Sequence, residues 1–173
     1  MDILNPNERA GVFDAASHLN IHGWTVVSDR VMGGLSGGKV VVNSDRLIFS
    51  GEVSLKNNGG FTMLKKQFSR ITLPGHNAFV VKLKGDKRPY QFRVKSNKDQ
   101  DHSHTYRFDT NGEWQEIVIP YALLTPKFRG RKLDLPGFEG KYLEEVGFLI
   151  GNKREENFEL QISYIGTALK NVH

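Results

Sequence analysis

The stretch that decides the fold reads Phe158-Glu159-Leu160-Gln161-Ile162-Ser163-Tyr164, in which apolar and polar side chains alternate. Successive side chains of a β-strand point to opposite faces of its sheet, so this alternation predicts a strand with one buried face and one polar face. The same period recurs at residues 90–95 and 105–109. Shorter apolar runs at residues 47–49, 79–83, 117–119 and 146–150 predict strands that are more fully buried.

Turn-forming residues separate these runs, as in Asn43-Ser44-Asp45 and Thr110-Asn111-Gly112, and the chain holds 18 glycines. Many short strands at this spacing predict an all-β protein, a β-sandwich or jelly roll. The best helix candidates are short, at residues 7–16 and 141–145. No repeat or linker divides the sequence, so we expect one domain over residues 1–173.

Composition narrows the class of protein. The chain has 173 residues, 38% apolar and 10% aromatic, which provides enough apolar surface for a folded core. It contains no cysteine, which excludes disulfides, thiolate catalysis and cysteine-ligated metals. Residues 1–6 lack the features of a targeting leader, and no apolar run approaches the roughly 20 residues of a membrane span. We therefore expect a cytoplasmic protein without a transmembrane segment.

The positive charge is concentrated in two segments. The formal net charge is +5, yet residues 82–107 alone hold eight basic and three acidic residues, and residues 125–132 add four basic residues and no acid. Such segments attract acidic proteins, anionic lipids or nucleic acids. We expect a protein partner and no nucleic acid. The plainer alternative is that these cations only cover the solvent side of exposed strands.

Two short motifs resemble those of enzymes, but neither has the required context. Residues 34–38 match the G-x-S-x-G pattern of a hydrolase, with Ser36 as the nucleophile, yet a strand rather than a helix is predicted to follow. Residues 33–39 nearly match a P-loop, but Val40 stands where a magnesium-binding Ser or Thr is needed. His102 and His104 lack an identifiable third metal ligand. We expect no catalysis, metal or cofactor.

A family resemblance begins at Trp24-Thr25-Val26-Val27-Ser28-Asp29-Arg30-Val31-Met32-Gly33-Gly34-Leu35-Ser36. This stretch resembles the start of the complex I intermediate-associated protein 30 family, in which a Trp precedes Asp-x-Val-Met-Gly-Gly-x-Ser. Further matching blocks occur in order at residues 49–55, 57–61, 85–90, 114–120, 128–131, 150–151 and 158–162. The resemblance covers about residues 10–166.

The resemblance implies a galactose-binding-domain-like β-sandwich, close to some carbohydrate-binding modules, and a chaperone role in assembling NADH:ubiquinone oxidoreductase. The sequence departs from the family in two ways. We expect it to have no transit peptide, which points to a stand-alone bacterial type of member. After Phe61, Lys65 stands where the family pattern leads us to expect an arginine, and lysine lacks the planar bidentate fork of that side chain.

The family blocks and the polar sides of the strands supply the candidate binding residues. We expect Asp29, Arg30, Asn57, Asn58, Asp86 and Arg129 to gather at one rim or face of the sandwich, where they would bind a polar ligand or a partner peptide. The complete candidate set is Asp29, Arg30, Met32, Gly33, Gly34, Ser36, Asn57, Asn58, Gly59, Gly60, Asp86, Tyr90, Arg93, Arg107 and Arg129. The alternative is that most of these residues maintain the sandwich, with Asn58-Gly59 as a hairpin turn.

A second candidate surface is the polar side of the alternating strands, where we expect Arg93 and Arg107 to share one sheet face with Gln91, Lys95, Glu159 and Gln161. The aromatic residues of these strands fall on the opposite face, which disfavours stacking of a sugar. The leading hypothesis is a non-enzymatic, chaperone-like module that binds a protein, such as an assembly intermediate of a respiratory complex. The alternative is a carbohydrate- or small-metabolite-binding domain.

Overall fold

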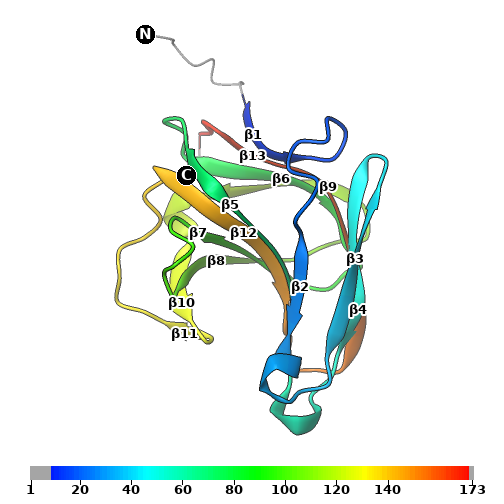
Figure 1. The fold of residues 1–173 in the computed structure, drawn as a ribbon. Helices are drawn as coiled ribbons and strands as arrows, with labels where there is room; N and C mark the ends of the chain where they lie inside the picture. The colour runs from blue at the N-terminus through cyan, green and yellow to red at the C-terminus, as the bar shows by residue number, and fades with distance from the viewer. Residues whose placement is uncertain (1–8, 172–173) are drawn as a thin grey trace.

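The computed structural model describes residues 9–171 and consists of two antiparallel β-sheets packed face to face (Figure 1). The first sheet has the order β3-β4-β13-β6-β9, and β1 also pairs with β13. These strands are β3 (Gly37–Asn43), β4 (Arg46–Val53), β13 (Glu156–Ala168), β6 (Ala78–Lys84), β9 (Trp114–Pro120) and β1 (Arg9–Asp14). We call this the six-stranded sheet.

The second sheet has the order β11-β10-β8-β7-β12-β5-β2, and we call it the seven-stranded sheet. Its strands are β11 (Arg131–Lys132), β10 (Thr125–Phe128), β8 (Ser103–Phe108), β7 (Tyr90–Lys95), β12 (Tyr142–Ile150), β5 (Thr62–Thr72) and β2 (Thr25–Ser28). Three short 3₁₀ turns, η1 (Asp29–Met32), η2 (Lys56–Asn58) and η3 (Tyr121–Leu123), complete the regular structure. The predicted all-β sandwich is confirmed.

The core forms where the inward residues of both sheets meet. The alternating residues Leu160 and Ile162 of β13 are fully buried, as are Phe92 and Val94 of β7. Aromatic side chains join the layers, because Phe79 of the six-stranded sheet lies 5.2 Å, centroid to centroid, from Phe92 of the seven-stranded sheet. The period-two pattern therefore identified the inward face of these strands.

Two sequence predictions are wrong. Residues 9–14 of the expected helix at residues 7–16 form strand β1, and residues 142–145 are the first residues of strand β12. In both places pairing with a neighbouring strand outweighs a weak local helix preference, since β1 lies along β13 and β12 is hydrogen-bonded on both edges. Residues 1–6, on which the expected absence of a leader rests, lie outside the described residues. No helix in the described part of the chain is long and apolar enough to cross a bilayer.

Candidate functional site

Asp29, a charged residue of the family blocks, is buried and serves as a structural centre. Its side chain is 1% exposed at the start of η1. Oδ1 accepts a hydrogen bond from the backbone N of Ser36 at 2.9 Å. Oδ2 accepts from Ser36 Oγ at 2.5 Å, Gly60 N at 2.5 Å and Phe61 N at 3.2 Å. Burial raises the pKa of Asp29, but these hydrogen bonds together outweigh it and hold that pKa below its usual value.

The glycines around Asp29 leave room for its carboxylate. A Cβ added at Gly34 would lie 2.2 Å from Asp29 Oδ1, and one added at Gly59 would lie 2.5 Å from Oδ2. Gly33 has a different reason to be glycine, because its φ of 88° lies in the left-handed region. These residues close a rigid junction between residues 28–36 and 54–61, which we call the Asp29 junction.

Ser36 belongs to this junction and is fully buried. Its Oγ donates to Asp29 and also accepts a hydrogen bond from Ser54 N at 2.8 Å. Strand β3 begins directly after it, so the strand-to-helix turn of a hydrolase nucleophile is absent at this point in the described structure. Ser36 joins two loops.

The predicted hairpin turn at Asn58-Gly59 is wrong. Asn57 and Asn58 adopt φ values of 56° and 59°, and the turn η2 connects β4 of one sheet to β5 of the other. These residues therefore lie in a connection between the two sheets. Asparagine suits their backbone conformation, because it tolerates the left-handed region better than most residues. Asn57, Asn58 and Met32 are exposed, whereas Gly60 is half-buried beside Asp29.

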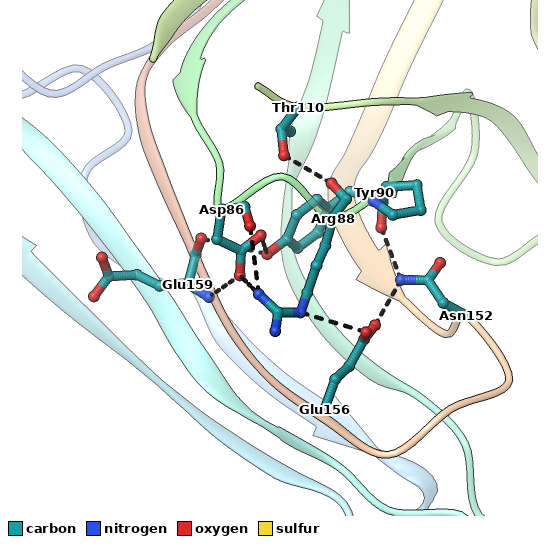
Figure 2. A network of polar contacts seen from close by, with 8 residues as sticks. Asp86, Arg88, Tyr90, Thr110, Asn152, Glu156 and Glu159 are labelled. Atoms are coloured by element: carbon teal, nitrogen blue, oxygen red, sulfur yellow. Dashed lines mark hydrogen bonds and ion pairs between the residues drawn. The ribbon is translucent and has the colours of Figure 1, made fainter. Parts of the chain in front are cut away.

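Asp86 and Tyr90 occupy a separate polar network that ties the β6–β7 connection to β13 (Figure 2). Tyr90 Oη donates to Asp86 Oδ1 at 2.9 Å, and Glu159 N donates to Asp86 Oδ2 at 2.8 Å. Arg88 bridges Asp86 and Glu156 at 3.2 and 3.3 Å. Burial, and then the neighbouring Asp86 carboxylate, raise the pKa of the Tyr90 hydroxyl. With its groups so paired, this network holds the two sheets together.

The expectation that these six residues gather at one rim or face is wrong. Asp29 follows β2, at one edge of the seven-stranded sheet, whereas Arg129 lies in the turn between β10 and β11, at the opposite edge. The Arg129 guanidinium stacks over its neighbour Phe128, 5.3 Å from the ring centroid. Asp86 lies in neither place, because it follows β6 of the six-stranded sheet.

Arg30 is the member of this set whose side chain lines a sizeable hollow. Its Nε donates to Ser36 O at 2.7 Å, and its side chain lines a hollow of about 610 Å³ between β2 and the β3–β4 hairpin. Lys39, Glu52 and Asn157 also line this hollow, which is bordered by glycine backbone at Gly37, Gly38 and Gly51. It is large enough for a small polar ligand.

The second predicted surface is divided between the two sheets. Arg93 and Arg107 do share a face, because Gln91 pairs with Arg107 and Arg93 pairs with Thr105 on adjacent strands of the seven-stranded sheet. Glu159 and Gln161 lie on β13 of the six-stranded sheet, so their inclusion was wrong. Alternation identifies which side of a strand is polar, but the sheet that a strand joins depends on tertiary pairing.

The outward side of the seven-stranded sheet, which we call the basic face, brings the two basic segments together. Strands β7 and β8 carry Arg93, Lys95 and Arg107 of the first segment, β10 and β11 carry the second, and β8 pairs with β10, whereas Lys82 and Lys84 of the first segment lie on β6 of the other sheet. The cations at outward positions are Lys65, Arg93, Lys95, Arg107, Lys127 and Lys132. Among the described residues paired in register on this face, Glu145 is the only carboxylate, and the preceding Glu144 is bound to Arg70 at 3.0 Å.

The middle of the basic face, which we call the recess, is shielded from solvent. Ser103, Thr105 and Glu145 point outward yet are only 2%, 5% and 4% exposed, and the sheet is visibly bent in Figure 1. At the centre Gly147, which has no side chain, pairs with Arg93 on one side and Lys65 on the other. A Cβ at Gly147 would lie 2.6 Å from the backbone oxygen of Leu64.

Arg93 is incompletely satisfied in this recess. One terminal nitrogen donates to Ser103 Oγ at 3.3 Å, while the buried Nε has no hydrogen-bond partner. Burial lowers the pKa of Arg93, and the charge of Glu145 opposes that shift. Lys65 Nζ lies 3.9 Å from Glu145 Oε1, and Arg107 forms no ion pair with any described residue.

Sequence reasoning missed part of this face. Ser103, Thr105, Glu145 and Gly147 carry no motif, and Lys127 was seen only as part of a charged segment. The two-residue period could have identified each of them as outward, but the order of strands was needed to bring them together. His104 points the other way, toward the core, and its Nε2 lies 3.1 Å from Pro136 O. No cluster of three or more potential metal ligands occurs among residues 9–171.

Known structures share this architecture. The family 11 carbohydrate-binding module of a cellulosomal cellulase from Clostridium thermocellum superposes with a TM-score of 0.66 at 14% sequence identity, covering 96% of this chain and 98% of that one. The same module in complex with a β-1,3-1,4-mixed-linked tetrasaccharide gives 0.66 at 13% identity, with coverages of 95% and 98%. A variant of a family 29 carbohydrate-binding module gives 0.55 at 12% identity, with coverages of 93% and 85%. At these identities the likeness establishes the jelly-roll, galactose-binding-like fold.

Sequence comparison identifies the family. A search of curated protein sequences gives no match. The family model for complex I intermediate-associated protein 30 matches residues 12–162, nearly the whole of the described chain, as the ordered glycine-rich blocks predicted. That family and the carbohydrate-binding fold are both non-catalytic kinds of domain. The chain therefore belongs to the complex I intermediate-associated protein 30 family.

Proposed function

We propose that this protein is a non-catalytic binding module whose basic face holds an acidic surface of a protein partner during assembly of a complex. The name of the family supports an assembly role, with a complex I-like respiratory enzyme as its target. The observation that carries the proposal is the concentration of cations on one face of one sheet. The other family residues, at the Asp29 junction and around Asp86, hold the scaffold that presents this face.

The charge of the basic face supports an acidic partner. Arg107, Lys127 and Lys132 make no ion pair with a described residue, so their charges are directed outward. Charges of one sign gathered on a surface accelerate encounter with a partner of the opposite sign and determine its orientation. The face is wide and polar, which suits a folded protein surface.

The recess at Gly147 supports a specific contact in addition to long-range attraction. Arg93 and Lys65 flank Gly147, and the Ser103 and Thr105 hydroxyls lie on β8, on the other side of Arg93. A carboxylate of the partner placed at Gly147 would approach both cations. Charge-assisted hydrogen bonds would offset the free-energy cost of removing that carboxylate from water. Lys65, which replaces the arginine expected from the family pattern, occupies one wall of this recess.

The test combines crosslinking with charge reversal. A photo-crosslinking amino acid is placed at Gln91 on the basic face, and a matched one at Glu116 on the outer side of the six-stranded sheet. In cells of the source organism, we expect a protein crosslink from position 91 only. Arg107→Glu with Lys127→Glu should reduce that crosslink about tenfold or more, because attraction becomes repulsion.

The matched control reverses two exposed cations of the six-stranded sheet, Lys39→Glu and Lys82→Glu, and so changes the net charge by the same amount. This control should leave the crosslink unchanged. Equal loss in both double variants would show that net charge alone matters. Crosslinks from Glu116 but not from Gln91 would place the partner on the other sheet. Either result would overturn the proposal.

A carbohydrate-binding role is the second candidate. It is favoured by the likeness to a module solved with a mixed-linked tetrasaccharide and by the polar hollow at Arg30. The aromatic side chains of β7 and β8 point inward, and Tyr90, Phe92 and Phe108 are buried, so these strands offer no stacking platform for a sugar ring on the basic face. Calorimetric titration with that tetrasaccharide tests this role, and binding abolished by Arg30→Ala would support it. No heat of binding, together with an empty glycan array, would dismiss it.

A further inference from the structure

We propose that the apolar tip formed by the loops at residues 29–35 and 54–60 docks onto an anionic lipid surface. The tip presents Val31, Met32, Leu35 and Leu55, whose side chains are 75%, 65%, 43% and 42% exposed. Exposed apolar residues gathered at one place mark an interaction site, whereas single ones are ordinary. The tip is separate from the basic face and does not depend on the function proposed for that face.

The two loops form a single tip. Asp29 of the first loop accepts hydrogen bonds from Gly60 and Phe61, at the end of the second, and Ser36 is hydrogen-bonded to Ser54. Figure 1 shows η1 and η2 side by side at the end of the sandwich, below the ends of β2 and β4. The Asp29 junction thus brings the apolar residues of both loops to the same end of the molecule.

The junction also keeps the tip rigid. Asp29 is anchored by four hydrogen bonds, and Gly33 N donates to Arg30 O at 3.1 Å to close the turn that carries Val31 and Met32. A loop already ordered loses little conformational entropy when it binds. The apolar side chains are therefore held in a fixed arrangement in which they are exposed to solvent.

Charge and shape select a lipid surface as the occupant. Arg30 and Lys56 are exposed at the tip, and the only acid in the two loops, Asp29, is buried. Cations beside apolar side chains match an anionic bilayer, whose headgroups attract Lys and Arg while the boundary below accepts apolar groups. The projecting loops need no complementary pocket in a bilayer. Glu52, Glu155 and Glu156 lie behind the tip, where with Lys56 they line a hollow of about 350 Å³. None of them forms an ion pair with Lys56, and Glu156 pairs with Arg88.

The experiment measures sedimentation of the full chain with vesicles of phosphatidylcholine mixed with phosphatidylglycerol, and with vesicles of phosphatidylcholine alone. We expect binding to the mixed vesicles and much weaker binding to the neutral ones. Val31→Ser with Met32→Ser should lower the partition coefficient about tenfold or more, because apolar surface no longer enters the interface. The matched control, Val41→Ser with Leu123→Ser, alters exposed apolar residues elsewhere and should bind like the wild type.

Insertion is tested separately from attraction. Because the chain contains no cysteine, Met32→Cys labelled with a polarity-sensitive dye reports on the tip alone, and Leu123→Cys provides the reference. We expect a blue shift on mixed vesicles at position 32 only. Absence of binding, equal binding by the serine variants, or equal dye spectra at both positions would overturn the proposal. A crosslink between the tip and a protein, together with an unchanged dye spectrum at position 32 on vesicles, would also overturn it, because the occupant would then be a protein.

Discussion

Replacing Asp29 by asparagine tests whether the most conspicuous family residue is structural. The substitution keeps the size of the side chain but replaces one carboxylate oxygen by an NH₂ group. Four donors converge on the carboxylate, three of them on Oδ2 and one, Ser36 N, on Oδ1. Whichever orientation the amide takes, at least one N–H or O–H group faces another donor.

The magnitude follows from this geometry. In the better orientation the NH₂ replaces Oδ1, so the hydrogen bond from Ser36 N is lost, which costs about 1.5–3 kcal/mol for a bond to a charged group. The three remaining bonds become neutral and weaker. We expect a loss of about 3 kcal/mol in the free energy of unfolding, or about 6–12 °C in Tm for a chain of this length.

Thermal denaturation followed by circular dichroism measures the effect, with Asp45→Asn as the control. Asp45 is an exposed acid that pairs only with its neighbour Arg46, so its replacement should change stability by about 0.5 kcal/mol or less. If Asp29→Asn melts at the same temperature as Asp45→Asn, Asp29 does not hold the two loops together, and its role as a structural centre is refuted.

Three further predictions concern the scaffold. Folding lowers the pKa of Asp29, so its ionised carboxylate stabilises the protein fully above the ordinary carboxyl pKa of about 3.9. This stabilisation is lost as the pH falls through the lower native pKa. The difference in Tm between wild type and Asp29→Asn should therefore narrow in acid. Gly34→Ala should cost about 2–3 kcal/mol in urea denaturation because its Cβ meets Asp29, whereas Gly33→Ala, with open space but a positive φ, should cost only about 1 kcal/mol. Tyr90→Phe removes the hydrogen bond to Asp86 and should cost about 1–2 kcal/mol in the same assay; an unchanged midpoint would contradict its role.

Local sequence patterns predicted the structure correctly where it depends only on residues close together in the chain. The period of two identified β7, β8 and β13 and their inward residues, and Asn43-Ser44-Asp45 marked the turn between β3 and β4. The same rules failed at residues 141–145 and at Asn58-Gly59. There the outcome depended on which distant strands were available for pairing, and no local pattern contains that information.

The residues of the candidate site also fall into two groups, those that the sequence identified and those that only the fold brought together. The family residues were easy to find, because charged and glycine-rich blocks are conspicuous in a sequence, yet Asp29 and Ser36 are buried in a junction. The recess around Gly147 has no motif. Its neighbours Arg93 and Lys65 are 28 residues apart in the chain, and only the order β7-β12-β5 places them on either side of one glycine.

The sequence by itself determined that this is an all-β member of its family, because alternation and turn chemistry act between near neighbours. It also showed that the positive charge lies in two segments. Only the tertiary structure decided that the later part of the first segment and the whole of the second lie on adjacent strands of one sheet, that Glu159 and Gln161 belong to the other, and that Asp29 faces inward. Strand order and sheet membership arise from contacts between residues far apart in the chain, which is why the location of a binding face had to come from the fold.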